Sequence, residues 1–141
     1  MNNELLELIN QYMEKGDFIG EVSDDDIARA EKLLEVNFPP EYKEFVKKFG
    51  SGGICGVDVL GVEGADYTSV VESTKRYRKL GLPKKYVVIE NVDEFVYCLS
   101  TLDEYNVVRW DDISSKKELD RYTTFYEYLQ DSFQEAMDNW D

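Results

Sequence analysis

The apolar residues of this chain change their spacing twice, and this change limits the folds that the chain can adopt. Up to Gly50 they recur every three or four residues, which predicts helices over 2–15, after Ser23 and after Pro40. β-branched and aromatic runs follow in the middle of the chain and predict strands. From Tyr122 to Trp140 the spacing is helical again. The pattern therefore predicts helices at both ends and strands between them.

The middle of the chain is predicted to form an antiparallel meander. The runs Tyr86–Val92, Glu94–Ser100 and Asn106–Trp110 are joined by short polar turns. An earlier strand is predicted over Ile54–Leu60, between glycines, and a helix over Asp66–Leu80. With 141 residues, the chain fits one domain. We therefore expect a single α+β domain, in which helices pack mainly on one face of an antiparallel sheet.

Charge excludes several classes of function. The chain has 30 acidic and 16 basic residues, a formal net charge of −14 and no histidine. Direct nucleic-acid binding is disfavoured, because release of phosphate counterions needs clustered cations. The lack of histidine removes Ser-His-Asp and Cys-His nucleophiles and imidazole ligands for metals. We expect a protein that is not an enzyme and that needs no cofactor or metal.

The sequence also predicts a cytoplasmic protein that does not bind membranes. No apolar run approaches the roughly 20 residues of a membrane span. The N-terminus lacks the basic region and apolar stretch of a signal peptide. The cysteines, Cys55 and Cys98, have no Cys-x-x-Cys spacing and are interpreted as buried, reduced thiols.

The acidic residues occur in blocks that hold no base. Four acids lie within Phe49–Thr74, five within Tyr86–Val108 and five within Tyr122–Asp141, whereas Lys75–Lys85 holds six bases and no acid. Any one block is typical of a solvated face. We expect the basic block to offset nearby acids within the molecule. The acidic blocks together indicate a surface for a basic partner, because a protein must otherwise tolerate their mutual repulsion.

The remaining polar motifs favour structural roles. The stretch 50–53, Gly-Ser-Gly-Gly, follows a helix and lacks the lysine of a phosphate-binding loop. The acids Asp24–Asp26 suit the first turn of a helix better than a calcium site. Adjacent acid pairs can cleave glycosides, but in a chain this acidic such pairs arise from composition alone. Two roles remain open for these pairs: they are simply solvated, or they form an acidic rim that faces a partner.

A longer motif runs from Ser23 to Gly53, through a helix, a Phe-Pro-x-x-Tyr turn, a second helix and a glycine-rich exit. Its residues are Ile27, Ala30, Glu31, Leu34, Val36, Phe38, Pro39, Tyr42, Phe45, Phe49, Gly50, Gly52 and Gly53. This motif resembles the signature of the SUKH superfamily, with Phe38 where leucine is more usual. Downstream runs agree, including Leu82-Pro83 and Val107–Trp110. The single domain, 1–141, would then comprise a helix and loop over 1–20 and a SUKH-like region over 21–141.

The resemblance implies a SUKH-like fold and, for bacterial members, usually an immunity protein. Such a protein binds and neutralises the toxic C-terminal domain of a polymorphic toxin, often a nuclease. The charge supports this role independently, because an acidic surface can occupy the basic cleft in which a nuclease holds nucleic acid. A non-catalytic regulatory adaptor for a protein or ligand is the alternative. The sequence does not set the oligomeric state.

The residues predicted to contact the partner flank the predicted strands and their loops. Ten are acidic: Asp58, Glu63, Asp66, Glu90, Asp93, Glu94, Asp103, Glu104, Asp111 and Asp112. Tyr97 and Trp110 are the predicted aromatic anchors, because tyrosine and tryptophan are enriched in the centres of interfaces. The resemblance itself assigns no binding residue.

Overall fold

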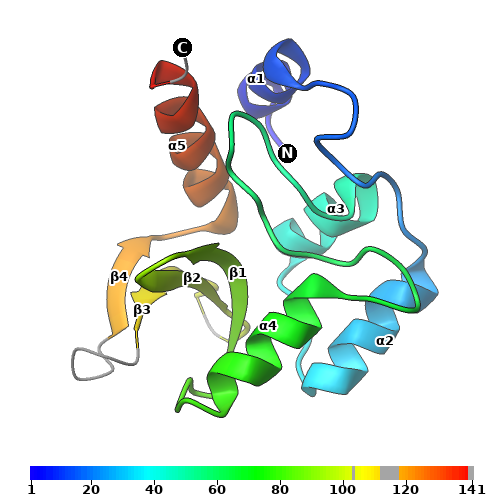
Figure 1. The fold of residues 1–141 in the computed structure, drawn as a ribbon, viewed down its shortest axis with the longest axis vertical. Coiled ribbons are helices and arrows are strands. Elements are labelled where there is room, and N and C mark those ends of the chain that lie inside the picture. Colours follow the sequence, from blue (N-terminus) through cyan, green and yellow to red (C-terminus); the bar gives the residue numbers. More distant parts are fainter. Residues whose placement is uncertain (103, 112–117, 140–141) are drawn as a thin grey trace.

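The helices and strands follow the predicted order, with helices at both ends of a four-stranded sheet. The computed structural model describes residues 1–102, 104–111 and 118–139. Within these residues the elements (Figure 1) are α1 (Asn3–Tyr12), α2 (Asp24–Leu34), α3 (Pro40–Phe49), α4 (Ser69–Arg78), β1 (Tyr86–Val92), β2 (Phe95–Ser100), β3 (Val107–Trp110), β4 (Glu118–Tyr122) and α5 (Phe125–Asp138). The expected α+β fold is therefore confirmed.

The sheet is an antiparallel meander in the order β1-β2-β3-β4. Its strands alternate between two apolar clusters, as the period of two residues requires. Val87, Leu99 and Val107 face the main core, whereas Val96 and Val108 belong to a smaller cluster on the other face. Both faces of the sheet are therefore packed, and the larger core lies on the face that the helices cover.

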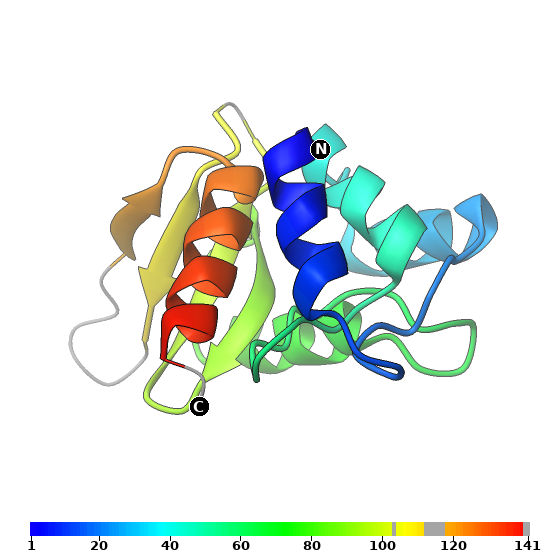
Figure 2. The ribbon, with the colours of Figure 1, turned by 90° about the horizontal axis from the view of Figure 1, so that it is seen from above.

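All five described helices contribute buried residues to the main core, and α1, α3 and α5 meet in one part of it. Figure 2 shows α5 lying across the sheet, with α1 beside it. Leu5 of α1, Phe45 of α3 and Phe125 of α5 are each less than 2% exposed. The rings of Phe45 and Phe125 meet edge to face, with their centres 5.5 Å apart. Burial of such aromatic pairs stabilises this interface.

The free edge of β1 is covered by α4 and by the loop that precedes it. Thr74 of α4 accepts a hydrogen bond from the Val88 amide through Oγ1 at 2.9 Å. The Leu60 amide donates to the Ile89 carbonyl at 2.8 Å. An uncovered edge strand can pair with other chains, so this cover limits aggregation.

Two details of the sequence prediction are corrected. Ile54–Leu60 is not a strand, because the chain turns at Cys55 and Gly56, which have positive φ angles of 52° and 89°. The segment forms only an isolated bridge through Val59. The last helix does not include Tyr122, which ends a fourth strand that the sequence reading did not predict.

The predicted helix boundaries are confirmed where a side chain or a ring fixes them. Ser23 caps α2 by accepting a hydrogen bond from the Asp26 amide at 3.1 Å. Pro40 opens α3, where its missing amide hydrogen costs nothing. Gly50 follows that helix with a φ of 73°, which favours glycine.

Gly52 should be far less tolerant of alanine than Gly16, although both have positive φ angles, of 116° and 93°. A Cβ at Gly52 would lie 2.0 Å from the Asp17 carbonyl oxygen, whereas a Cβ at Gly16 meets nothing within 4 Å. We expect Gly16→Ala to lower the free energy of unfolding by about 1–2 kcal/mol and Gly52→Ala by at least about 3 kcal/mol. Urea denaturation measures both, and equal losses would contradict the close contact.

Candidate functional site

A groove lies between the C-terminal half of α5 and the end of the sheet where β1 turns into β2. Its volume is about 320 Å³, and its lining combines aromatic rings with two acids and no base. The lining residues are Val57, Glu90, Val92, Phe95, Tyr97, Tyr122, Ser132, Glu135, Ala136 and Asn139. Three separate parts of the chain therefore meet here: the loop before α4, the β-meander and α5.

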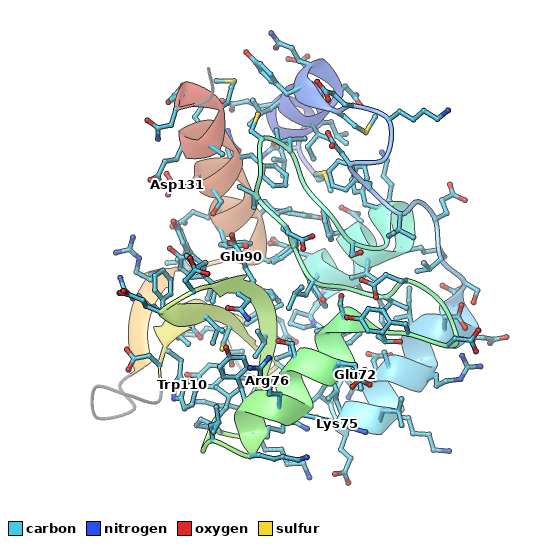
Figure 3. All side chains as sticks on the ribbon, in the orientation of Figure 1. Glu72, Lys75, Arg76, Glu90, Trp110 and Asp131 are labelled. Carbon is cyan, nitrogen blue, oxygen red and sulfur yellow. The ribbon has the colours of Figure 1, made fainter. Side chains whose placement is uncertain are left out.

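A β-bulge turns Glu90 toward the helices. The register shifts between Val88, which pairs with Cys98, and Glu90, which pairs with Tyr97. The extra residue places Glu90 on the same face as Ile89, although neighbours in a regular strand face opposite sides. Glu90 therefore points from β1 toward α5 (Figure 3).

A buried tyrosine of α5 positions the Glu90 carboxylate. The hydroxyl of Tyr128 donates a hydrogen bond to Glu90 Oε1 at 2.6 Å. Burial raises the pKa of Glu90, and this outweighs the lowering effect of the Tyr128 hydrogen bond. Burial and the nearby Glu90 raise the pKa of Tyr128 well above its ordinary value, so the phenol remains a donor. Glu90 is therefore a partly desolvated acid held in a fixed position.

Tyrosine rings surround this acid. The ring of Tyr97 lies 5.4 Å from that of Tyr128 and 6.1 Å from that of Tyr122, measured between centres. The Tyr122 hydroxyl donates to Asp131 Oδ2 at 2.7 Å, and burial with this hydrogen bond raises the pKa of Tyr122. The wall of the groove therefore consists of rings held by contacts with α5.

The acids around the groove lack counter-charges. In the described part of the chain, Asp58, Glu94 and Glu135 make no ion pair; the ion pairs there use acids between residues 24 and 44. The last turn of α5 contains no basic residue, so no positive side chain within the helix offsets the negative end of its dipole. The potential in the groove therefore favours a cation.

The structure brings together part of the predicted binding set. Glu90 and Tyr97 line the groove, and the exposed acids Asp93 and Glu94 form the turn between the two strands beside it. Asp58 lies close enough to Glu90 to raise the pKa of that carboxyl further. These residues make one surface.

The other predicted residues lie elsewhere. Glu63 has a structural role, because its carboxylate accepts a hydrogen bond from the Ser69 amide at 2.7 Å where α4 begins. Asp66 is exposed in the loop before α4, and Glu104 is exposed in the loop at the opposite end of the sheet from the groove. Asp111 follows β3 at the same end of the sheet as the β1–β2 turn. Asp103 and Asp112 lie outside the described residues.

The placement of Trp110 corrects its proposed role as an anchor. It is 1% exposed and belongs to the smaller cluster, on the face of the sheet away from α5. Its ring meets Tyr77 of α4 edge to face, with 6.1 Å between centres. A partner cannot reach this ring in the folded protein, so Trp110 contributes to the core.

Sequence reasoning missed the contribution of α5 to the groove. Ser132, Glu135, Ala136 and Asn139 all line it. Their spacing of three, one and three residues places them on one face of a helix, which was the available signal. This face contains few large apolar residues, which distinguishes it from the buried stripe of the same helix.

The bases within Lys75–Lys85 were expected to offset nearby acids of the molecule, and only some of them do so. Lys84 pairs with Glu35 at 3.0 Å. Arg78 instead donates to the carbonyl oxygens of Leu34 and Lys84, at 2.9 and 2.8 Å. Lys75 and Arg76 are exposed on α4 (Figure 3), on a different side of the molecule from Asp131 of α5. These two exposed bases of α4 therefore do not face the acids of α5.

Comparison with known proteins places this α+β domain in a family. A SUKH family model described as SMI1-KNR4 cell-wall matches residues 2–134. The chain belongs to the SUKH superfamily, as the motif from Ser23 to Gly53 predicted. A crystal structure of a protein from Pseudomonas syringae pv. tomato has the same fold, with a TM-score of 0.69 and 18% identity over 99% of this chain and 98% of that one. No described helix is long and apolar enough to cross a membrane.

Glu90→Gln should stabilise the fold increasingly as the pH rises. Because burial raises its pKa, the folded protein binds this proton more tightly than the unfolded chain, so stability is lost as Glu90 ionises. Glutamine keeps an acceptor for Tyr128 and removes the charge. We expect the unfolding free energy of Glu90→Gln to exceed that of wild type by an amount that grows from about pH 4 to about pH 7.

The matched control is Glu94→Gln, which removes the same charge from an exposed turn. Urea denaturation at several pH values should find this control within about 0.5 kcal/mol of wild type throughout. If the difference in unfolding free energy between Glu90→Gln and wild type does not change with pH, the carboxyl of Glu90 is not desolvated.

Proposed function

We propose that this protein is a non-catalytic immunity protein. It binds the C-terminal toxic domain of a cognate polymorphic toxin, a nuclease in the simplest case, and blocks the basic cleft of that domain. Family membership supports a protein that acts through a partner protein. The observation that carries the proposal is the groove between α5 and the β1–β2 turn, in which aromatic rings and acids without counter-charges form one surface.

The acidic groove suits such a partner for a simple electrostatic reason. A nuclease concentrates cations where it holds phosphate groups, and an acidic inhibitor presents charges of the opposite sign to the same cations. The net charge of −14 steers encounter over distances of about a Debye length, roughly 10 Å at 0.1 M salt. Rapid capture suits an inhibitor that must act before the toxin does.

Steering alone does not hold a complex together, because exposed charge pairs contribute little to affinity. The groove adds the other requirement, rings that a partner can contact, in Phe95, Tyr97 and Tyr122. Two of its side chains are also held in place: Tyr128 fixes Glu90, and Asp131 of α5 accepts a hydrogen bond from Tyr122. Prior ordering of these side chains reduces the entropy lost on binding.

The direct test is co-expression with the toxin domain encoded beside the gene for this protein. We expect wild-type protein to restore growth and to co-purify with the toxin domain at one-to-one stoichiometry. Continued toxicity without a complex would refute the proposal. Recovery of one stoichiometric housekeeping protein from toxin-free cells would favour the adaptor alternative.

The association rate should depend steeply on salt. We expect the rate constant for binding a catalytically inactive toxin domain to fall at least about tenfold between about 0.02 and 0.5 M NaCl, because ions screen the acidic surface. Stopped-flow fluorescence measures this rate. An association rate constant that does not change with salt would show that charge does not steer the encounter.

A pair of charge-matched double variants locates the surface. Glu94→Gln with Glu135→Gln removes two acids at the groove, and Asp66→Asn with Glu104→Gln removes two exposed acids away from it. We expect the first pair to slow association several-fold at low salt and the second pair to have less than about a twofold effect. Equal effects would mean that net charge, and not the groove, steers the partner.

A further inference from the structure

We propose, building on the immunity function above, that the groove receives one arginine side chain of the partner, with Glu90 as its carboxylate and aromatic rings as its walls. The inference specifies the chemistry of the contact and not the identity of the toxin. It depends on three features of the described residues: the free oxygen of Glu90, the rings that line the groove and the negative end of α5.

The first feature is a carboxylate with one oxygen available. Oε1 of Glu90 accepts the 2.6 Å hydrogen bond from Tyr128, and no described residue donates a hydrogen bond to Oε2. The side chain is half-buried and lines the groove. Because Tyr128 already fixes its direction, Glu90 binds a cation without first losing rotational freedom. A charge-assisted hydrogen bond to such a carboxylate is stronger than one in open solvent.

The second feature is the aromatic wall, which favours arginine over lysine. Phe95, Tyr97 and Tyr122 line the groove. A guanidinium is planar and stacks on such rings, whereas an ammonium is a compact and strongly hydrated charge. The chain provides an example in the same cluster, because the guanidinium carbon of its own Arg109 lies 3.8 Å from the centre of the Phe95 ring.

The third feature is the sign of the charge around the opening. Glu135 lines the groove, and the last turn of α5 has no basic residue to offset the helix dipole. Two bases border the rings without lining the groove. Arg109 stacks on Phe95, and the pKa of Arg121 is raised chiefly by the neighbouring Tyr97. Both bases keep their positive charge and reduce the negative potential nearby, but neither lines the groove, whose own charged residues, Glu90 and Glu135, are both acids.

The occupant is an arginine on the surface of the partner protein, because the proposed function makes the partner a protein and the groove complements a guanidinium. The nearby acids Asp58 and Glu94 add to the attraction for this cation.

The test uses the full chain, labelled with nitrogen-15, and a small probe in place of the toxin. N-acetyl-arginine-N-methylamide carries the guanidinium without free charges at its ends, and the corresponding citrulline derivative is its neutral isostere. We expect the arginine probe to shift the amide resonances of Glu90, Tyr97 and Ala136, with a dissociation constant on the order of millimolar. The citrulline probe should cause no saturable shift, and the lysine derivative should bind at least about threefold more weakly.

Variants connect these shifts to Glu90. Glu90→Gln should weaken binding of the arginine probe about fivefold or more, and the control Glu104→Gln, at an exposed acid away from the groove, should change it less than twofold. Tyr128→Phe removes the hydrogen bond that fixes Glu90 and should weaken binding by an intermediate factor. Shifts spread over the whole acidic surface, or shifts that Glu90→Gln leaves unchanged, would overturn the proposal.

A second measurement separates this inference from the proposed function. With the inactive toxin domain, we expect Glu90→Gln to raise the dissociation rate about tenfold while the association rate changes less than twofold. If the toxin binds wild-type protein but Glu90→Gln dissociates at the wild-type rate, the inference fails and the immunity function stands. If the toxin does not bind at all, the function fails, and the small-probe titration still decides whether the groove accepts arginine.

Discussion

The buried hydroxyl of Tyr42 is the contact on which the arrangement of helices, loop and sheet depends. Tyr42 is fully buried, and its hydroxyl donates to the Leu60 carbonyl at 2.7 Å. The Leu60 amide in turn donates to Ile89 of β1. The Tyr42 ring also meets Phe38 and Phe125 edge to face, each at 5.1 Å between centres. One side chain of α3 thus connects α5 with the loop that covers the edge of β1, and burial raises its pKa so that it remains a donor.

The division of acids between two roles follows from this arrangement. Around α2 and α3, acids pair with bases, as Asp24 does with Lys47 and Glu31 with Lys43. Around the groove, Asp58 and Glu135 have no such partners among the described residues. Unpaired acids repel one another and lower stability, but they remain available to a cation from outside. The groove therefore combines a cost to the fold with a capacity to bind.

Local patterns predicted most of the fold because they reflect local physics. Helical spacing, the Ser23 cap and the proline at the start of α3 identified α2 and α3, and β-branched runs identified β1 to β3. The error at Ile54–Leu60 has a different origin. An apolar run between glycines fits either a strand or a turn that is buried by packing, and here contacts with α3 and β1 decide between them.

The candidate site was less predictable, because it depends on contacts between distant segments. The acidic blocks indicated that a partner surface exists, but composition could not distinguish Glu90, in the groove, from Glu63, which caps α4. Regular alternation would also have placed Glu90 and Ile89 on opposite faces. Only the bulge, a feature of the pairing with β2, turns Glu90 toward Tyr128.

The bulge also bears on how a family of such proteins can diversify. In a regular strand each position either packs the core or faces solvent, and its neighbours constrain it accordingly. The unpaired residue, Ile89, shifts this alternation so that position 90 faces the groove, while the pairs Val88 with Cys98, Glu90 with Tyr97 and Asn91 with Val96 are kept. Substitutions at this position can therefore alter what the groove recognises without disturbing the register of the sheet. A sheet built in this way can keep its architecture while the residues that line its groove change.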